Sequence, residues 1–272
     1  MLLTPEFLKS NIMKTKLTFL ALLPTGLLLA DHHGEQTVKK LYPNTPVIPG
    51  SEYTVHDTTR PQPRKVETKG AVFVAAPSDA KVLFDGTNTE AWKGEWRVEN
   101  GILIASPGRL ITKEEFGDCQ VHIEYKVPAD RKVMGQSGGN SGIFLMGKYE
   151  VQIGESYTNI TYPDGQAGAI YGQTPHLVNP ATPQGEWQSY DIIFKAPVSK
   201  DGIVVTPAEI TVLFNGVVVQ ASYKIQGPTR HKTTTSYPKN HPAKGPITLQ
   251  WHSDPIEYRN IWVRDLGDYD QQ

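Results

Sequence analysis

Two short segments of the chain carry acidic, amide and imidazole side chains at alternating positions. Glu150 and Gln152 alternate with apolar residues in 149–153, and Thr248, Gln250 and His252 do the same in 246–252. Successive side chains of a β-strand point to opposite faces, so each segment would turn its polar residues to one face and its apolar residues to a core. A carboxylate and an imidazole can exchange protons with a ligand, and amides can bind its hydroxyl groups. The alternative is the ordinary solvated face of an antiparallel sheet.

The elements that would position these residues are short strands. Asn100-Gly101 and Asn215-Gly216 each separate two apolar-rich runs, which is typical of hairpin turns. No helical periodicity occurs beyond the N-terminal segment. The pattern predicts an all-β protein, an antiparallel β-sandwich or jelly roll. Strands are expected at 81–84, 96–99, 101–104, 109–112, 119–127, 141–146, 149–153, 169–171, 187–196, 209–214, 217–223, 246–252 and 258–266.

The long strand predicted at 119–127 also assigns its side chains to the core or to the outer face. Its alternation turns Cys119, the only cysteine of the chain, toward the core as a small buried hydrophobe. His122 and Glu124 then point outward, where solvated positions are the simplest interpretation. The same reasoning directs Trp251 inward. The remaining tryptophans are expected in the core rather than as sugar platforms: Trp92, Trp96, Trp187 and Trp262.

The N-terminus has the pattern of an export signal. Lys14 and Lys16 precede an apolar run at 17–29, and polar residues follow Ala30 abruptly. We expect residues 1–30 to be a signal peptide and the mature protein to be periplasmic or extracellular, with no membrane span. An N-terminal membrane anchor is the alternative. Residues 31–79 are rich in proline and predict an extended N-terminal arm, either disordered or packed along the sandwich, while 80–267 form the β-sandwich domain.

Composition excludes some partners. The formal net charge is −1, from 27 Lys and Arg against 28 Asp and Glu, which gives no basic surface for nucleic acid. No HxxxH, CxxC or dense acidic loop occurs, so the sequence predicts no metal ligands and requires no cofactor. His231 and His241 flank a loop rich in Thr and Pro; a plain surface loop is the simpler interpretation, and a lid over the site is the alternative.

An ordered series of motifs resembles one known family. The chain is similar, over about residues 80–266, to the 3-keto-disaccharide hydrolase domain, long catalogued as a domain of unknown function. The arm, with Tyr42-Pro43 and Val55-His56-Asp57, is similar to one subgroup. The motifs that carry the resemblance are Val82 to Gly86 with Trp92, Gly139 to Leu145, Tyr149 to Gln152, Gly168 to Gly172, Trp187 to Ile192, Asn215 to Val217, Gly245 to Gln250 and Arg259 to Ile261.

This resemblance implies a fold like the concanavalin A-like lectins and glucanases, and glycosides oxidised to a ketone at carbon three as substrates. Such a ketone acidifies the hydrogen on carbon two, so elimination and hydration can cleave the glycosidic bond. Glu150 and His252 are the candidate catalytic acid and base, in either order. A retaining or inverting glycosidase would need two carboxylates, but the run Glu150 to Gly154 has only one acid.

The candidate substrate-binding residues come from the same motifs. Gln152, Gln250 and Asn140 could stabilise the enolate, or a divalent cation could do so. The full set of predicted substrate-binding residues is Asn140, Gln152, Glu155, Tyr171, Gln250 and Arg259. Two positions depart from the subgroup: Gly154-Glu155 stands where it has Leu-Asp, and Trp251 where it has an acid.

These departures keep a second function open. The partner is expected to be a small carbohydrate, and the protein is either an enzyme that cleaves 3-keto glycosides or a non-catalytic carbohydrate-binding module of the cell envelope. A structural protein of the envelope is a third hypothesis. Geometry distinguishes the first two: Glu150, Gln152, Gln250 and His252 should converge in one cavity for an enzyme, and form a shallow aromatic groove for a binding module.

Overall fold

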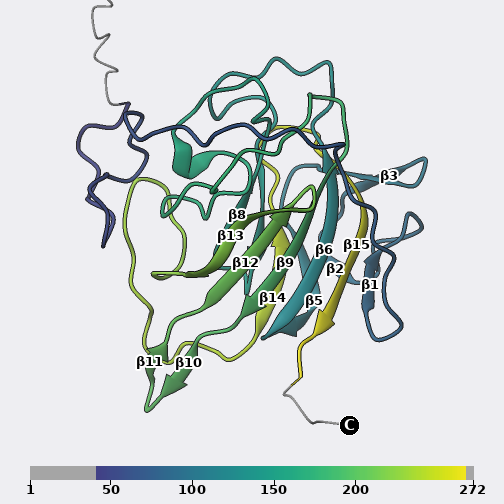
Figure 1. Cartoon of the computed structure of the whole chain (residues 1–272). Helices are drawn as coiled ribbons and strands as arrows, with labels where there is room; N and C mark the ends of the chain where they lie inside the picture. The colour runs from purple at the N-terminus through teal and green to yellow at the C-terminus, as the bar shows by residue number, and fades with distance from the viewer. Residues whose placement is uncertain (1–40, 268–272) are drawn as a thin grey trace, which may run out of the picture. The chain divides into compact units, whose positions relative to one another are not determined.

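Two antiparallel sheets form the fold of residues 41–267, the part of the chain described by the computed structural model (Figure 1). The first has eight strands, the second has five, and a two-stranded hairpin projects from the first. The eight-stranded sheet contains β13 (Val217–Lys224), β12 (Glu209–Phe214), β9 (Gln188–Lys195), β6 (Cys119–Lys126), β15 (Glu257–Asp265), β4 (Ile102–Ile104) and β3 (Arg97–Glu99) in this order, with β1 (Lys81–Phe84) paired to β15. The five-stranded sheet runs β2 (Trp92–Lys93), β5 (Leu110–Phe116), β14 (Gly245–Leu249), β7 (Ser141–Leu145) and β8 (Tyr149–Ile153), and the hairpin is β10 (Val198–Lys200) with β11 (Ile203–Thr206).

The core lies between the two sheets because each strand turns its apolar residues inward. Val151 and Ile153 of β8 and Ile247 and Leu249 of β14 are fully buried in one apolar cluster with residues of the opposite sheet. The predicted all-β antiparallel sandwich is therefore confirmed. Both predicted hairpins are present: Asn100-Gly101 joins β3 to β4, and Asn215-Gly216 joins β12 to β13, with the asparagines at φ 52° and 50°.

Two predicted strands differ from the structure. Residues 169–171 make only isolated bridges, because Ile170 pairs with Val151 on one side and Thr174 on the other without extending a ladder. The strand expected at 246–252 ends at Leu249. Beyond it, Gln250 keeps one backbone contact, its N–H donating to the Gly142 carbonyl at 3.0 Å, before the chain leaves the sheet.

The N-terminal arm packs along the sandwich over its described residues. Figure 1 shows it passing across the strand ends and descending beside β15 to β1. Backbone bonds tie it to the loop before β9: the Val66 N–H donates to the Asn179 carbonyl at 2.8 Å, and Ala71 donates to Trp187 at 2.8 Å. The expected signal peptide, residues 1–30, lies outside the described residues. Among residues 41–267, no helix has the length and apolar character needed to cross a membrane.

The expectation that His122 and Glu124 are solvated is wrong. Both side chains point away from the core but are fully buried. His122 stacks on Trp262 with ring centroids 5.5 Å apart, and the Trp262 indole N–H donates to the Val74 carbonyl of the arm at 2.9 Å. The arm therefore covers this polar face, which alternation alone assigns to solvent.

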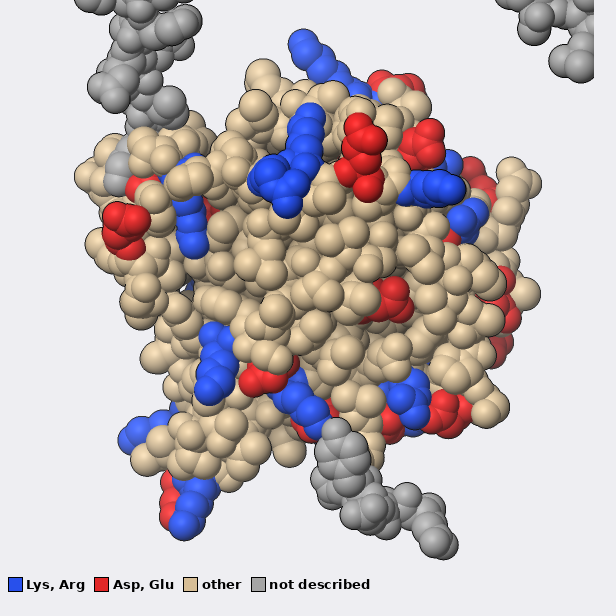
Figure 2. Space-filling view, in the orientation of Figure 1, with Lys and Arg blue, Asp and Glu red and all other residues tan. Residues whose placement is uncertain are grey.

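The single cysteine and most tryptophans lie where the sequence predicts. Cys119 is buried, and burial raises the pKa of its thiol to about 12, which makes it a poor nucleophile. Trp92, Trp96 and Trp262 are buried, whereas Trp187 is only half-buried and carries the Arg259 guanidinium over its ring at 4.1 Å. Charged residues of both signs are scattered over the face drawn in Figure 2.

Candidate functional site

The outer face of the five-stranded sheet forms the floor of a cavity. Strands β7 and β8 and the segment after β14 supply its base, and loops supply its walls. Its volume is about 500 Å³. We call it the central cavity; its lining residues are Tyr42, Arg109, Gln136, Ser137, Asn140, Phe144, Glu150, Gln152, Tyr162, Tyr171, Thr229, Arg230, His231, Gln250 and His252.

Glu150 is the buried acid of this cavity. Its side chain projects from the polar face of β8 opposite Phe144 of β7, and the residue is only 7 % exposed. Burial raises the pKa of its carboxyl to about 8, and the positive charge of Arg109 opposes part of this shift. No side chain or backbone group of residues 41–267 hydrogen-bonds the carboxylate. Glu150 is therefore a proton-exchanging group that is available to a ligand.

Three amides lie beside Glu150. The Gln152 side-chain amide donates to Asn140 Oδ1 at 3.1 Å and to Gln136 Oε1 at 3.2 Å. Gln136 in turn donates to the Gly165 carbonyl at 2.7 Å, which fixes the cluster to a loop. Gln152 Oε1 is buried and has no partner in the described chain. A buried acceptor without a donor is costly, so this oxygen is suited to a ligand hydroxyl.

Gln250 and His252 enter the cavity from the end of β14. Their place beside Glu150 and Gln152 is the convergence that the sequence predicts for an enzyme, because all four residues line one cavity. His252 is exposed at the rim, while Gln250 is half-buried. Neither side chain forms a hydrogen bond within residues 41–267. Both therefore remain free to contact a ligand.

Aromatic residues form one wall of the cavity. The Tyr171 hydroxyl lies 2.9 Å from the Tyr162 hydroxyl and 2.9 Å from His231 Nδ1. Burial, with smaller contributions from nearby His56, Lys232 and His252, lowers the pKa of His231 below its usual value. The Tyr171 hydroxyl donates to His231 Nδ1 in one imidazole tautomer and accepts from it in the other.

The N-terminal arm completes this wall. Tyr42 lines the cavity, and the His56 ring lies 4.0 Å from that of Tyr162 and 5.0 Å from that of His231. The fully buried carboxylate of Asp164 accepts the His56 backbone N–H at 2.9 Å and lies 3.4 Å from His56 Nδ1. The arm therefore contributes side chains to the wall of the cavity.

Several lining residues were not predicted from the sequence. Gln136, Tyr162 and His231 lie in loops, where alternation carries no information, and Arg109 stands just before β5 although the predicted strand at 109–112 included it. The only signal for Tyr42 was the resemblance of the arm to a family subgroup. His231 is exposed, as expected for a surface loop, and also lines the cavity. The same expectation is wrong for His241, which is buried and lies 2.7 Å from the Tyr149 hydroxyl.

Two predicted substrate-binding residues lie outside the central cavity. The Glu155 carboxylate accepts the backbone N–H groups of Tyr157, Thr158 and Asn159 at 2.8–2.9 Å, so it stabilises a loop. Arg259 lies on the other sheet and pairs with Glu124 at 2.7 Å. The structure brings Asn140, Gln152, Tyr171 and Gln250 together with Glu150 and His252, but not these two.

Trp251 does not contribute to the cavity. It packs against the core, as alternation predicts. No group of three or more His, Cys, Asp or Glu residues in the described chain could hold a metal ion. The functional groups that line the cavity are one carboxyl, two imidazoles, amides, three tyrosines, a serine and a threonine hydroxyl, and two guanidinium groups.

Comparison with known proteins agrees with this architecture. A crystal structure of a proposed glycosyl hydrolase from Parabacteroides distasonis superposes with a TM-score of 0.69 at 44 % identity, covering 75 % of this chain and 90 % of that chain. A second proposed glycosyl hydrolase from the same organism superposes with a TM-score of 0.50 at 18 % identity, covering 70 % and 94 %, and supports the fold alone. No curated protein matches the chain. Residues 79–264 match the 3-keto-alpha-glucoside-1,2-lyase-like domain, and the chain belongs to this family of carbohydrate-active proteins.

Proposed function

We propose that this protein is an exported enzyme that cleaves 3-keto glycosides by elimination followed by hydration. The observation that carries the proposal is that Glu150, Gln152, Gln250 and His252 line one cavity although they come from β8 and from the segment after β14, which lie far apart in the sequence. Family membership supports a carbohydrate ligand, and the single carboxylate on the floor disfavours hydrolysis by a carboxylate pair.

Glu150 is assigned as the base. Its ionised form removes the hydrogen from carbon two, and the electron pair of the C–H bond forms an enolate whose charge resides on the carbon-three oxygen. A carboxylate that is hard to ionise is a stronger base once ionised, because the surrounding apolar protein solvates its charge poorly. Arg109 and the Gln250 amide line the cavity without a hydrogen-bond partner in the described chain, and they are assigned as the donors to the enolate oxygen.

His252 is assigned as the acid. As the enolate collapses, the bond from carbon one to the leaving oxygen breaks, and the His252 imidazolium gives that oxygen its proton. Water then adds to carbon one of the resulting enone, and a proton returns to carbon two. The products are a free 3-keto sugar and the released alcohol, with no net change in oxidation state.

The test follows the carbon-two hydrogen. The protein is incubated with a 3-keto disaccharide in D₂O, and the released keto sugar is analysed by mass spectrometry against an enzyme-free control. Elimination and hydration place one deuterium at carbon two, whereas direct hydrolysis places none. Glu150→Gln and His252→Ala should abolish release and leave folding intact; Lys200→Gln on the β10–β11 hairpin should not affect it.

The competing function is a non-catalytic carbohydrate-binding module. It predicts that the same disaccharide binds without being cleaved. Binding without release by the wild-type protein would therefore overturn the enzymatic assignment. Full activity in both Glu150→Gln and His252→Ala would instead remove those residues from the mechanism.

A further inference from the structure

A second cavity adjoins the central one. Its volume is about 650 Å³, and Arg109, Phe144, Thr229 and Arg230 line both cavities. We call it the basic cavity. Its remaining lining residues come from the β7–β8 turn and from the loop before β14: Gly147, Lys148, Pro228, Thr235, Ser236 and Pro238. Because they share these residues, the two cavities lie side by side.

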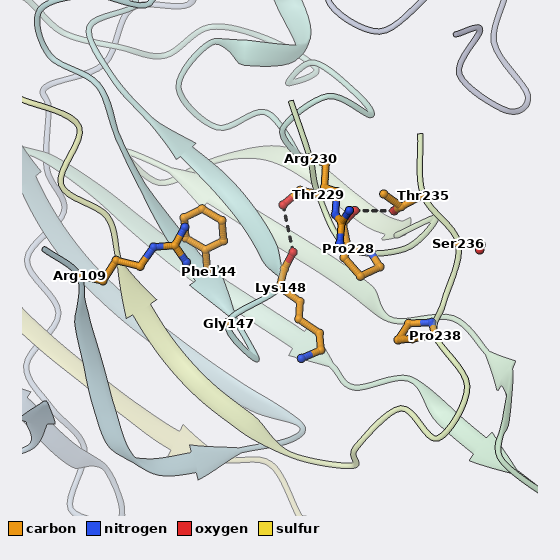
Figure 3. Close-up of a pocket in the computed structure, with 10 residues that line it drawn as sticks. All are labelled: Arg109, Phe144, Gly147, Lys148, Pro228, Thr229, Arg230, Thr235, Ser236 and Pro238. Atoms are coloured by element: carbon orange, nitrogen blue, oxygen red, sulfur yellow. Dashed lines mark hydrogen bonds between the residues drawn. The ribbon is translucent and has the colours of Figure 1, made fainter. Parts of the chain in front are cut away.

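The charges around the basic cavity have one sign. Arg109, Lys148 and Arg230 line it, and within the described chain its lining includes no Asp or Glu. None of these three cations forms an ion pair in residues 41–267. Figure 3 shows the Arg109 guanidinium against the Phe144 ring, 5.2 Å from its centroid, and Lys148 extending on the Pro238 side. Unpaired cations around one hollow attract a negatively charged ligand.

The cavity is also preformed. The Thr229 hydroxyl and backbone N–H both donate to the Lys148 carbonyl at 3.0 Å, and the same hydroxyl accepts the Glu150 N–H at 3.1 Å. Figure 3 shows the first of these bonds and a second one, from Thr235 to the Pro228 carbonyl, which closes the loop on itself. These bonds fix the loop of the basic cavity to the strand that carries Glu150.

The other lining groups suit a sugar ring. Phe144, Pro228 and Pro238 offer apolar surface to C–H faces, and Thr235 and Ser236 offer hydroxyl groups. A small inorganic anion would use only the cations and leave most of the volume unfilled. A sugar unit with a carboxylate or sulfate uses both kinds of surface.

We propose that the basic cavity binds an anionic sugar unit adjoining the keto sugar, so that the substrates are glycosides with a carboxylate or sulfate on the neighbouring unit. This inference rests on the proposed function for the position of the keto sugar. The binding of the anionic unit stands on the basic cavity itself.

The experiment measures binding of sugars that cannot react. Isothermal titration compares three non-oxidised disaccharides that differ in one unit: neutral, carboxylated as a glucuronate, and sulfated. The anionic pair should bind about five- to tenfold more tightly than the neutral one, and this preference should fall as sodium chloride is raised. Comparison of the two anionic sugars shows whether the cavity favours carboxylate or sulfate.

Lys148→Gln is the decisive variant because Lys148 lines the basic cavity and not the central one. It should weaken binding of the anionic sugars about three- to fivefold, the effect of one exposed ion pair, and leave binding of the neutral sugar unchanged. Lys200→Gln removes the same charge from a residue that lines neither cavity and should change nothing. Equal binding of all three sugars by the wild type, or a preference that is undiminished in Lys148→Gln, overturns the inference.

The two proposals fail separately. If neither a neutral nor an anionic 3-keto disaccharide is cleaved while the Lys148-dependent preference is present, the enzymatic function is wrong and the anionic subsite stands. If the neutral substrate is cleaved and no preference exists, the function stands and the subsite is wrong.

Discussion

The Glu150 carboxylate lies in the space that a side chain at position 142 would occupy. Gly142 of β7 pairs with Gln152 of β8, and the Glu150 side chain crosses diagonally from β8 over the bare Gly142 backbone. An ideal Cβ at Gly142 would clash with the Glu150 carboxylate. The glycine in the Gly139–Leu145 motif therefore has a physical role: it leaves room for the proposed base on the cavity floor.

Gly142→Ala should consequently impair activity more than stability. The added methyl group displaces the Glu150 carboxylate, and a misplaced base costs about 10- to 100-fold in kcat. The melting temperature and kcat on a 3-keto disaccharide are the two measurements. Gly154→Ala is the matched control, because the nearest atom to its added Cβ is 3.5 Å away. Equal losses in both variants would contradict the specific role of Gly142.

The pH profile should report the ionisation of Glu150. A base with a pKa of about 8 is mostly protonated at neutral pH, so kcat/KM should have a rising limb that reports its ionisation, and loss of the His252 proton should produce a falling limb. Because the charge of Arg109 lowers this pKa, Arg109→Gln should shift the rising limb to higher pH. Arg97→Gln, at an exposed residue paired with Glu99, is the control. A rising limb that stays in place in Arg109→Gln would contradict the assignment of Glu150 as the base.

Glu150→Gln should raise the stability of the protein although it abolishes activity. The native carboxyl keeps its proton up to a pKa of about 8, whereas an unfolded glutamate loses it near its ordinary pKa of 4.5. Between these values the native state binds more protons, so wild-type stability falls as pH rises. Glutamine does not titrate, and the variant should gain about 1–3 kcal/mol over the wild type by neutral pH and nothing at acidic pH.

Urea unfolding across this pH range measures the difference. Glu95→Gln, at an exposed position, should follow the wild-type curve. A constant offset between Glu150→Gln and the wild type at every pH would show that the change in stability does not come from proton binding.

The packing of the N-terminal arm against the sandwich should depend on Asp164. Asp164→Ala leaves the buried His56 N–H without its acceptor, which should cost about 2–4 kcal/mol in the free energy of unfolding. Release of the arm also removes Tyr42 and His56 from the aromatic wall, so KM should rise. Limited proteolysis within 41–79 and urea unfolding measure these effects. Asp79→Asn, which loses an exposed pair with Arg264, should leave the free energy of unfolding essentially unchanged.

The alternation of side chains along strands predicted their surroundings correctly on β8 but not on β6. It placed Glu150 and Gln152 on one face of β8 because Tyr149, Val151 and Ile153 fill the core, and no other register satisfies them. The same reasoning assigned His122 and Glu124 to solvent, since alternation distinguishes two faces but does not say what covers the outer one. There the arm covers them, with Val74 bonded to Trp262 and Asn260.

By itself, the sequence determined the all-β class, both Asn-Gly hairpins and the polar face that carries Glu150 and Gln152, because these depend on side-chain period and local backbone preference. The tertiary structure decided that Gln250 and His252 join that face although β14 ends at Leu249. It also decided that Arg109 lies near Glu150, that Glu155 serves a loop, and that Tyr42 reaches the cavity from the arm. Those relationships join residues far apart in the chain, and loop paths over a sheet depend on packing rather than on a local repeat.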